Sequence, residues 1–174
     1  MRRMFLFASL VLASACAQQE KPATPPPASL TVADSAIKTP ESVIYDAAGD
    51  RYLVANINGS PLEKDNNGFI SHVMPDGVVH AAHWIQGGVN GVTLNAPKGM
   101  AITGDSLFVA DIDAVRVFDR TTGKPLGSRS VPGATFLNDM AAGPDGTIYV
   151  TDSGLKPGPN GFAESGTDAL YRFG

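Results

Sequence analysis

Residues 97–111, PKGMAITGDSLFVAD, decide the fold of this chain. Two short runs rich in apolar and β-branched residues flank the pair Gly104-Asp105, an arrangement typical of a β-hairpin. A helix would be interrupted by such a turn. The stretch therefore predicts two antiparallel strands joined by a tight connection.

The same pattern occurs twice more along the chain. Residues 40–56 read PESVIYDAAGDRYLVAN, and residues 137–152 read LNDMAAGPDGTIYVTD. The three copies start 57 and 40 residues apart, and an insertion at residues 58–67 explains the longer interval. Repeats of about 40 to 50 residues are typical of β-propellers.

Each of the first two units continues into a second hairpin. Residues 68–85 surround the turn Pro75-Asp76-Gly77, and residues 114–131 surround Thr122-Gly123. Four strands make one propeller blade. The third unit adds strands only at residues 137–143, 147–152 and 168–173. We therefore expect an all-β chain whose residues 39–174 form a partial β-propeller of about two and three-quarter blades.

Known propellers close with four to eight blades. We therefore expect the sequence to be a piece of a longer propeller; otherwise, two copies would have to complete a ring by self-association. An open stack of blades also exposes the apolar faces of its first and last sheets.

The N-terminus has the features of an export signal. Residues 1–15 carry Arg2 and Arg3 before an apolar stretch that is too short to span a bilayer. Ala13-Ser14-Ala15-Cys16 resembles the lipobox of bacterial lipoproteins, which predicts lipidation of Cys16 and a Pro-rich linker over residues 16–38. A plain secretory peptide cut nearby is the alternative. We expect an exported protein of the bacterial cell envelope, held to the membrane by a lipid anchor.

The composition excludes several classes of protein. The chain has 13 Lys plus Arg against 17 Asp plus Glu, so it lacks the basic excess that nucleic acid requires. A content of 43% hydrophobic and 17% charged residues argues against a disordered chain. A single cysteine excludes an internal disulfide and a multi-cysteine metal cluster.

Several side chains outside the repeat starts are predicted to be structural. Asp111 and Asp152 recur at the ends of the second strands, where we expect them to fix the following turn. Trp84 is expected in the core or between blades. His80 and His83 should point to opposite faces of one strand, which argues against a histidine metal site with His72.

Glu41, Lys98 and Asn138 occupy the same position in the three copies. Blade symmetry should aim them, with Asp139, at one end of the axial channel. Carboxylate and amide oxygens suit a hard cation. In the alternative interpretation, the Lys98 ammonium forms a salt bridge in place of the cation, and the channel binds anionic ligands or nothing. The alternatives are that Glu41 is a solvated turn residue and that Asn138 caps its own turn.

Four segments carry a resemblance to a known family: Pro40-Glu41, Leu137-Asn138-Asp139, Pro144-Asp145-Gly146 and residues 149–154, YVTDSG. Over residues 40–174 the chain resembles the senescence-marker-protein/gluconolactonase family of regucalcin-like, six-bladed propellers, and also the NHL-repeat propellers. The resemblance implies one divalent cation, calcium or zinc, held in part by residues matching Glu41 and Asn138. It also implies metal-assisted hydrolysis of a sugar lactone. The family's essential Asp from a later blade has no counterpart here, so we expect these 174 residues to be inactive by themselves.

Two functions follow from these observations. The first is an exported, lipid-anchored, gluconolactonase-like propeller that hydrolyses a small lactone or similar ester. The alternative is a non-catalytic NHL-type propeller that acts as a binding or scaffold module of the cell envelope. No catalytic residue is assigned from the sequence.

Overall fold

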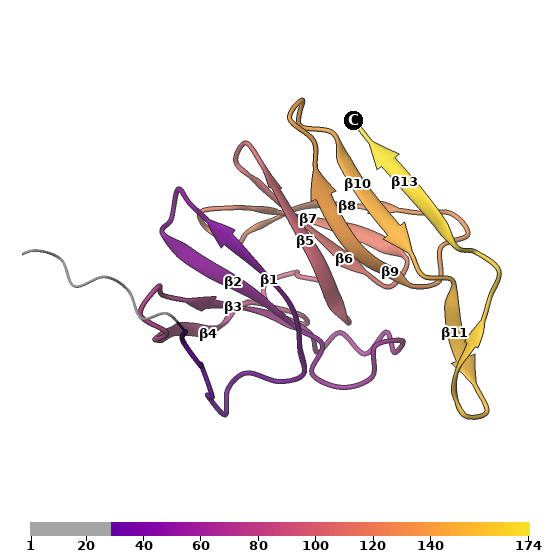
Figure 1. Ribbon diagram of the computed structural model, residues 1–174, viewed down its shortest axis with the longest axis horizontal. Coiled ribbons are helices and arrows are strands. Elements are labelled where there is room, and N and C mark those ends of the chain that lie inside the picture. Colours follow the sequence, from indigo (N-terminus) through magenta and orange to yellow (C-terminus); the bar gives the residue numbers. More distant parts are fainter. Residues whose placement is uncertain (1–28) are drawn as a thin grey trace, which may run out of the picture.

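The computed structural model describes residues 29–174, which form thirteen β-strands in four sheets (Figure 1). The predicted all-β, propeller-type architecture is confirmed. Within the described residues no helix is long and apolar enough to cross a membrane. The predicted signal peptide at residues 1–15 and the lipidation site Cys16 lie outside the described residues.

The first two sheets are complete four-stranded blades with antiparallel neighbours in sequence order. The strands of blade 1 are β1 (Pro40–Asp46), β2 (Arg51–Asn56), β3 (Phe69–Val73) and β4 (Val79–Gln86). The strands of blade 2 are β5 (Pro97–Thr103), β6 (Ser106–Asp111), β7 (Ala114–Asp119) and β8 (Pro125–Ser130). These bounds agree with the strands that the repeat predicts.

The third sheet, blade 3, has three strands in the order β13-β10-β9. They are β9 (Leu137–Ala142), β10 (Ile148–Asp152) and β13 (Ala169–Phe173). A separate hairpin of β11 (Leu155–Gly158) and β12 (Gly161–Glu164), which the sequence did not predict, is inserted between β10 and β13. Figure 1 shows this hairpin projecting beside the third sheet.

Asp111, the last residue of β6, holds the segment that leads into β5. Its fully buried carboxylate accepts hydrogen bonds from the backbone N–H groups of Asn95 and Ala96 at 3.0 and 2.9 Å. It also accepts from the Asn95 amide at 2.9 Å and from Arg116 Nε at 2.8 Å. The sequence predicted that Asp111 fixes the turn that follows it, and this needs correction. The backbone groups that it binds belong to Asn95 and Ala96, which precede it by 16 and 15 residues.

The other two blades repeat this arrangement. Asp152 accepts from the backbone N–H groups of Thr135 and Phe136, and also from Gly154 N–H in the following turn, as predicted. In blade 1 the equivalent residue is Asn56, whose amide oxygen accepts from Lys38 N–H at 2.9 Å. A buried acceptor at the end of each second strand therefore positions the start of each first strand.

Apolar layers between neighbouring sheets hold the blades together. Between blades 1 and 2, Leu53, Ile70 and Ile85 form one core with Leu107 and Phe118. A second core between blades 2 and 3 consists of residues that come from both sheets and the loop between them: Ala101, Ala110, Val115, Val131, Ala134, Leu137, Met140, Ile148 and Val150. Trp84 packs against the first core, as predicted.

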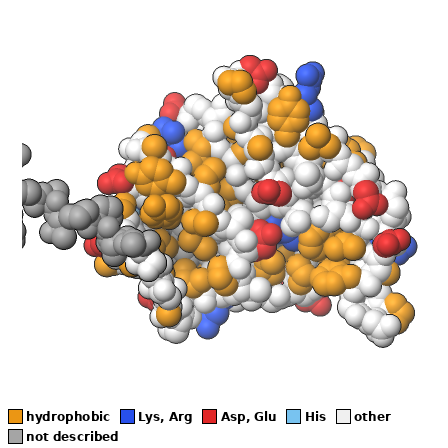
Figure 2. Space-filling view, viewed as in Figure 1, with side chains coloured by type: hydrophobic (Ala, Val, Ile, Leu, Met, Phe, Trp, Pro, Cys, Tyr) orange, Lys and Arg blue, Asp and Glu red, His pale blue; other side chains and the backbone are white. Residues whose placement is uncertain are grey.

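The far side of blade 1 is an open apolar face. Val43 and Tyr52 are 63% and 38% exposed, whereas Met100 and Leu107, their equivalents in the repeat, are 6% and 0% exposed beneath blade 1. Figure 2 shows hydrophobic side chains gathered over the part of the molecule where β1 and β2 lie. The face of each sheet that points toward its preceding neighbour is thus built for burial.

Replacing Asp111 with Ala should lower the free energy of unfolding by about 3–5 kcal/mol, because it leaves the Arg116 guanidinium and two backbone N–H groups without their buried partner. Urea unfolding measures this loss. The matched control is Asp113→Ala, which removes an ion pair between Lys64 and a half-buried Asp113 and should cost less than about 1 kcal/mol. Equal losses in the two variants would contradict the role given to Asp111.

Candidate functional site

The first strands of the three sheets, β1, β5 and β9, lie side by side. Ser42 in β1 donates its hydroxyl hydrogen bond to the carbonyl of Lys98 in β5 at 2.8 Å. On the other side, β5 approaches β9 so closely that a methyl group on Gly99 would lie 2.5 Å from Cα of Asp139. These contacts bring the segments that carry Glu41, Lys98 and Asp139 together. We call Glu41, Lys98, Asn138 and Asp139 the axial mouth.

Gly99 is required for this approach. A Cβ added at Gly99 would also lie 2.6 Å from the backbone nitrogen of Met140, which is too close for two atoms that are not bonded to each other. Backbone atoms cannot rotate away as a side chain would, so a larger residue would push β5 and β9 apart. The glycine next to Lys98 therefore sets the spacing of the mouth.

Lys98 is buried between blades 2 and 3, with 1% of its surface exposed. Its ammonium donates to the carbonyl of Ala96 at 3.0 Å and lies 4.4 Å from the centre of the Phe136 ring. Burial lowers the pKa of Lys98 to about 8, although the nearby Asp111 and Glu41 carboxylates favour the charged form. The Lys98 side chain is therefore still mostly in its protonated, charged form at neutral pH.

Glu41 reaches solvent at the edge of the mouth. Partial enclosure by neighbouring groups raises the pKa of its carboxyl above the ordinary value. The Lys98 ammonium acts in the opposite direction, and the Asp139 carboxylate adds to the increase. A carboxyl group of raised pKa that reaches solvent suits proton transfer.

Blade 3 contributes Asn138 and Asp139. Asn138 is half-buried, and Asp139 is exposed. The Asp139 carboxylate accepts a hydrogen bond from Met140 N–H at 2.8 Å, so this residue provides the local backbone contact that the sequence offered as an alternative for Asn138. Of the two, Asp139 lies against Gly99 of β5.

The mouth does not fit a divalent cation while the Lys98 ammonium lies beside its oxygen donors. Glu41 and Asn138 supply the two ligands that the family resemblance implies, but the same position in blade 2 carries the buried Lys98 ammonium. A positive charge there opposes a second cation. Among residues 29–174, no group of three His, Cys, Asp or Glu side chains could hold a metal ion.

The three histidines are also accounted for. The rings of His72 and His80 lie 4.8 Å apart, whereas His83 stacks on Phe69 at 4.1 Å. His80 and His83 therefore contact different residues on opposite faces of blade 1, as predicted.

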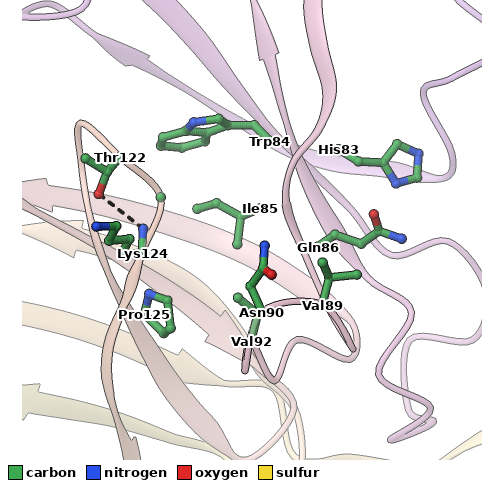
Figure 3. Close-up of a pocket in the computed structure, with 11 residues that line it drawn as sticks. His83, Trp84, Ile85, Gln86, Val89, Asn90, Val92, Thr122, Lys124 and Pro125 are labelled. Carbon is green, nitrogen blue, oxygen red and sulfur yellow. Dashed lines mark hydrogen bonds between the residues drawn. The ribbon is translucent and has the colours of Figure 1, made fainter.

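A groove of about 480 Å³ lies between the outer strand of blade 1 and the β7–β8 turn of blade 2. Figure 3 shows Thr122, Lys124 and Pro125 of this turn across from Ile85 and Asn90. None of the residues of the axial mouth lines the groove. Sequence patterns did not indicate it, because it forms where two distant hairpins meet. We call it the rim groove.

The lowered pKa of Lys98 makes its contribution to stability dependent on pH. Between about pH 8 and 10.5 the folded chain releases this proton while the unfolded chain keeps it, so stability should rise with pH in this window. Urea unfolding of the wild type relative to Lys98→Met should show a rise on the order of 3 kcal/mol. The control is the surface variant Lys64→Met, which keeps Lys98, so its unfolding free energy relative to that of Lys98→Met should rise with pH as the wild type's does. If the difference in unfolding free energy between the wild type and Lys98→Met did not change with pH, this would contradict the burial of the charge.

No protein-family model matches the chain, and no curated protein matches it significantly. Solved structures do match, among them a Thermus thermophilus protein described provisionally as an oxidoreductase (glucose dehydrogenase). It is 18% identical, with a TM-score of 0.50, and the match covers 76% of this chain and 43% of that one. The chain thus spans less than half of this neighbour. At such low identity the likeness concerns the fold alone, and the described residues are part of a β-propeller.

Proposed function

We propose that the chain forms part of an exported, sugar-acting propeller of the bacterial cell envelope, and that the axial mouth binds a small polyhydroxylated ligand. The observation that carries this proposal is the meeting of β1, β5 and β9, which brings the charged side chains of Glu41, Lys98 and Asp139 close enough to affect one another. Convergent polar groups at an axis supplied by several elements are typical of ligand sites. Export and lipidation at Cys16 rest on the sequence alone.

The reaction that we propose is hydrolysis of a sugar lactone, as the resemblance to the gluconolactonase family implies. Water attacks the lactone carbonyl carbon, the ring C–O bond breaks, and the product is a hydroxy acid. Glu41 would take the proton from the water and return it to the leaving ring oxygen, a role that its solvent contact and raised pKa support. Asn138 would orient the ligand through its amide. The calcium or zinc that the same resemblance implies remains a sequence-based prediction, and no step is assigned to it because Lys98 opposes it.

The second candidate is a non-catalytic binding module of the NHL type. The rim groove favours it, because this cavity lies away from the mouth and presents Asn90, Thr122 and Lys124 together with apolar side chains. A peptide or glycan of the cell envelope bound there would need no contact with Glu41.

Glucitol, an uncharged open-chain polyol, tests the mouth as a ligand site. It should raise the thermal midpoint of the wild type, since a ligand that binds only the folded state stabilises it. Glu41→Gln should weaken glucitol binding at least about tenfold, a change of about 1.4 kcal/mol, because the carboxylate accepts stronger hydrogen bonds from hydroxyl groups than an amide does. In a preparation that hydrolyses gluconolactone, the same change should lower kcat about 10²–10⁴-fold.

The surface variant Lys64→Met is the control and should bind glucitol as the wild type does. Binding that survives Glu41→Gln but is lost on Lys124→Ala would move the ligand to the rim groove and favour the binding module. Absence of glucitol binding in the wild type and all variants would contradict the mouth as a sugar site.

A further inference from the structure

Lys98 is the feature of the mouth that the proposed function leaves without a role. It occupies in blade 2 the position that Glu41 occupies in blade 1 and Asn138 in blade 3. Unlike them it is almost fully buried, with 1% of its surface exposed. A lysine is rarely buried unless its charge is compensated, so the reason for this burial lies in its surroundings.

The side chain of Lys98 is held on two sides. Its ammonium donates to the carbonyl oxygen of Ala96 at 3.0 Å, and the face of the Phe136 ring lies 4.4 Å away. A carbonyl oxygen and an aromatic face both attract a cation. The ammonium is therefore fixed by parts of the two segments that lead into β5 and β9.

The backbone of Lys98 is fixed as well. The hydroxyl group of Ser42 donates a hydrogen bond to the carbonyl of Lys98. Gly99, which follows Lys98, packs against Asp139. Lys98 thus lies in the middle strand of three, between the two strands that carry the acidic residues of the mouth. The backbone that carries the ammonium is therefore held between these two strands.

A divalent cation needs a ligand set that is negative on balance. Here Glu41 and Asp139 provide two negative charges, and the Lys98 ammonium acts on Glu41 against them. The carboxylate that favours the charged form of Lys98 most strongly is Asp111, which is already paired with Arg116. The acidic groups of the mouth already have a positive neighbour within the fold, and an added metal ion would be repelled by it.

We propose that Lys98 is a fixed internal cation that takes the place of a divalent metal ion in the axial mouth, so that this mouth works without metal. The proposal accepts the mouth as the ligand site of the proposed function but does not depend on the ligand. It implies that the oxygen donors of Glu41, Asn138 and Asp139 are competent for a metal once the ammonium is removed.

Calcium titration of purified protein, followed by calorimetry and thermal midpoint, tests the proposal. The wild type and the surface control Lys64→Met should show no calcium binding at millimolar concentration. Lys98→Met should bind calcium at least tenfold more tightly than the wild type. The double variant Lys98→Met/Glu41→Gln should lose that binding, which assigns it to the mouth.

Two results would overturn the proposal. The first is calcium binding by the wild type that Glu41→Gln abolishes, because the metal would then share the mouth with Lys98. The second is a folded Lys98→Met that still binds no calcium, because the ammonium would then not be what keeps the cation out. If Lys98→Met does not fold, Lys98→Gln replaces it in the same titration. If neither variant folds, calcium titration of the wild type and of Glu41→Gln decides the question. Failure of glucitol to bind would contradict the proposed function and leave this metal titration unchanged.

Discussion

The buried acceptor at the end of each second strand is the interaction on which the rest of the structure depends. Asn56, Asp111 and Asp152 accept backbone N–H groups from the segments that precede β1, β5 and β9. Left unpaired in these locations, each N–H would cost about 1–3 kcal/mol. Because the anchored segment enters the first strand, the acceptor also sets where that strand begins. The position of the mouth residues follows from it, since they lie at or just after these starts.

The inner strands can meet only because the contacts between them are small. Gly99 admits the backbone of β9, and Ser42 bonds to the carbonyl of Lys98. Larger cores farther along the strands then hold the sheets apart and supply most of the apolar burial. The arrangement separates two tasks: apolar layers stabilise the stack of blades, while the close inner contacts position polar side chains.

The repeat predicted the strands because hairpins are local structures. The alternation of residues and the Gly-Asp or Pro-Asp-Gly turns are readable without knowledge of the rest of the chain, and β1, β2, β5 and β6 begin and end where the pattern does. The hairpin β11–β12 was missed because Pro157 and its glycines obscure any alternation. The sequence predicted that Asp111 binds the turn after it, whereas it binds the segment around Asn95 before β5. That segment reaches Asp111 only when β5 and β6 pair, which a local pattern does not reveal.

The candidate site was predictable in position but not in character. Equivalent repeat positions named Glu41, Lys98 and Asn138, yet burial distinguishes them: the middle residue is enclosed by sheets on both sides, whereas Glu41 reaches solvent. A sequence contains no measure of that enclosure, although the enclosure decides which side chain can contact a ligand and which can act only through its charge. Blade 1 contributes Glu41, blade 2 contributes Lys98, and blade 3 contributes Asn138 and Asp139, so the charge of the mouth is a sum over blades. An ammonium in one blade cancels a carboxylate in the next, and the need for a metal ion depends on this sum rather than on the presence of any one ligand.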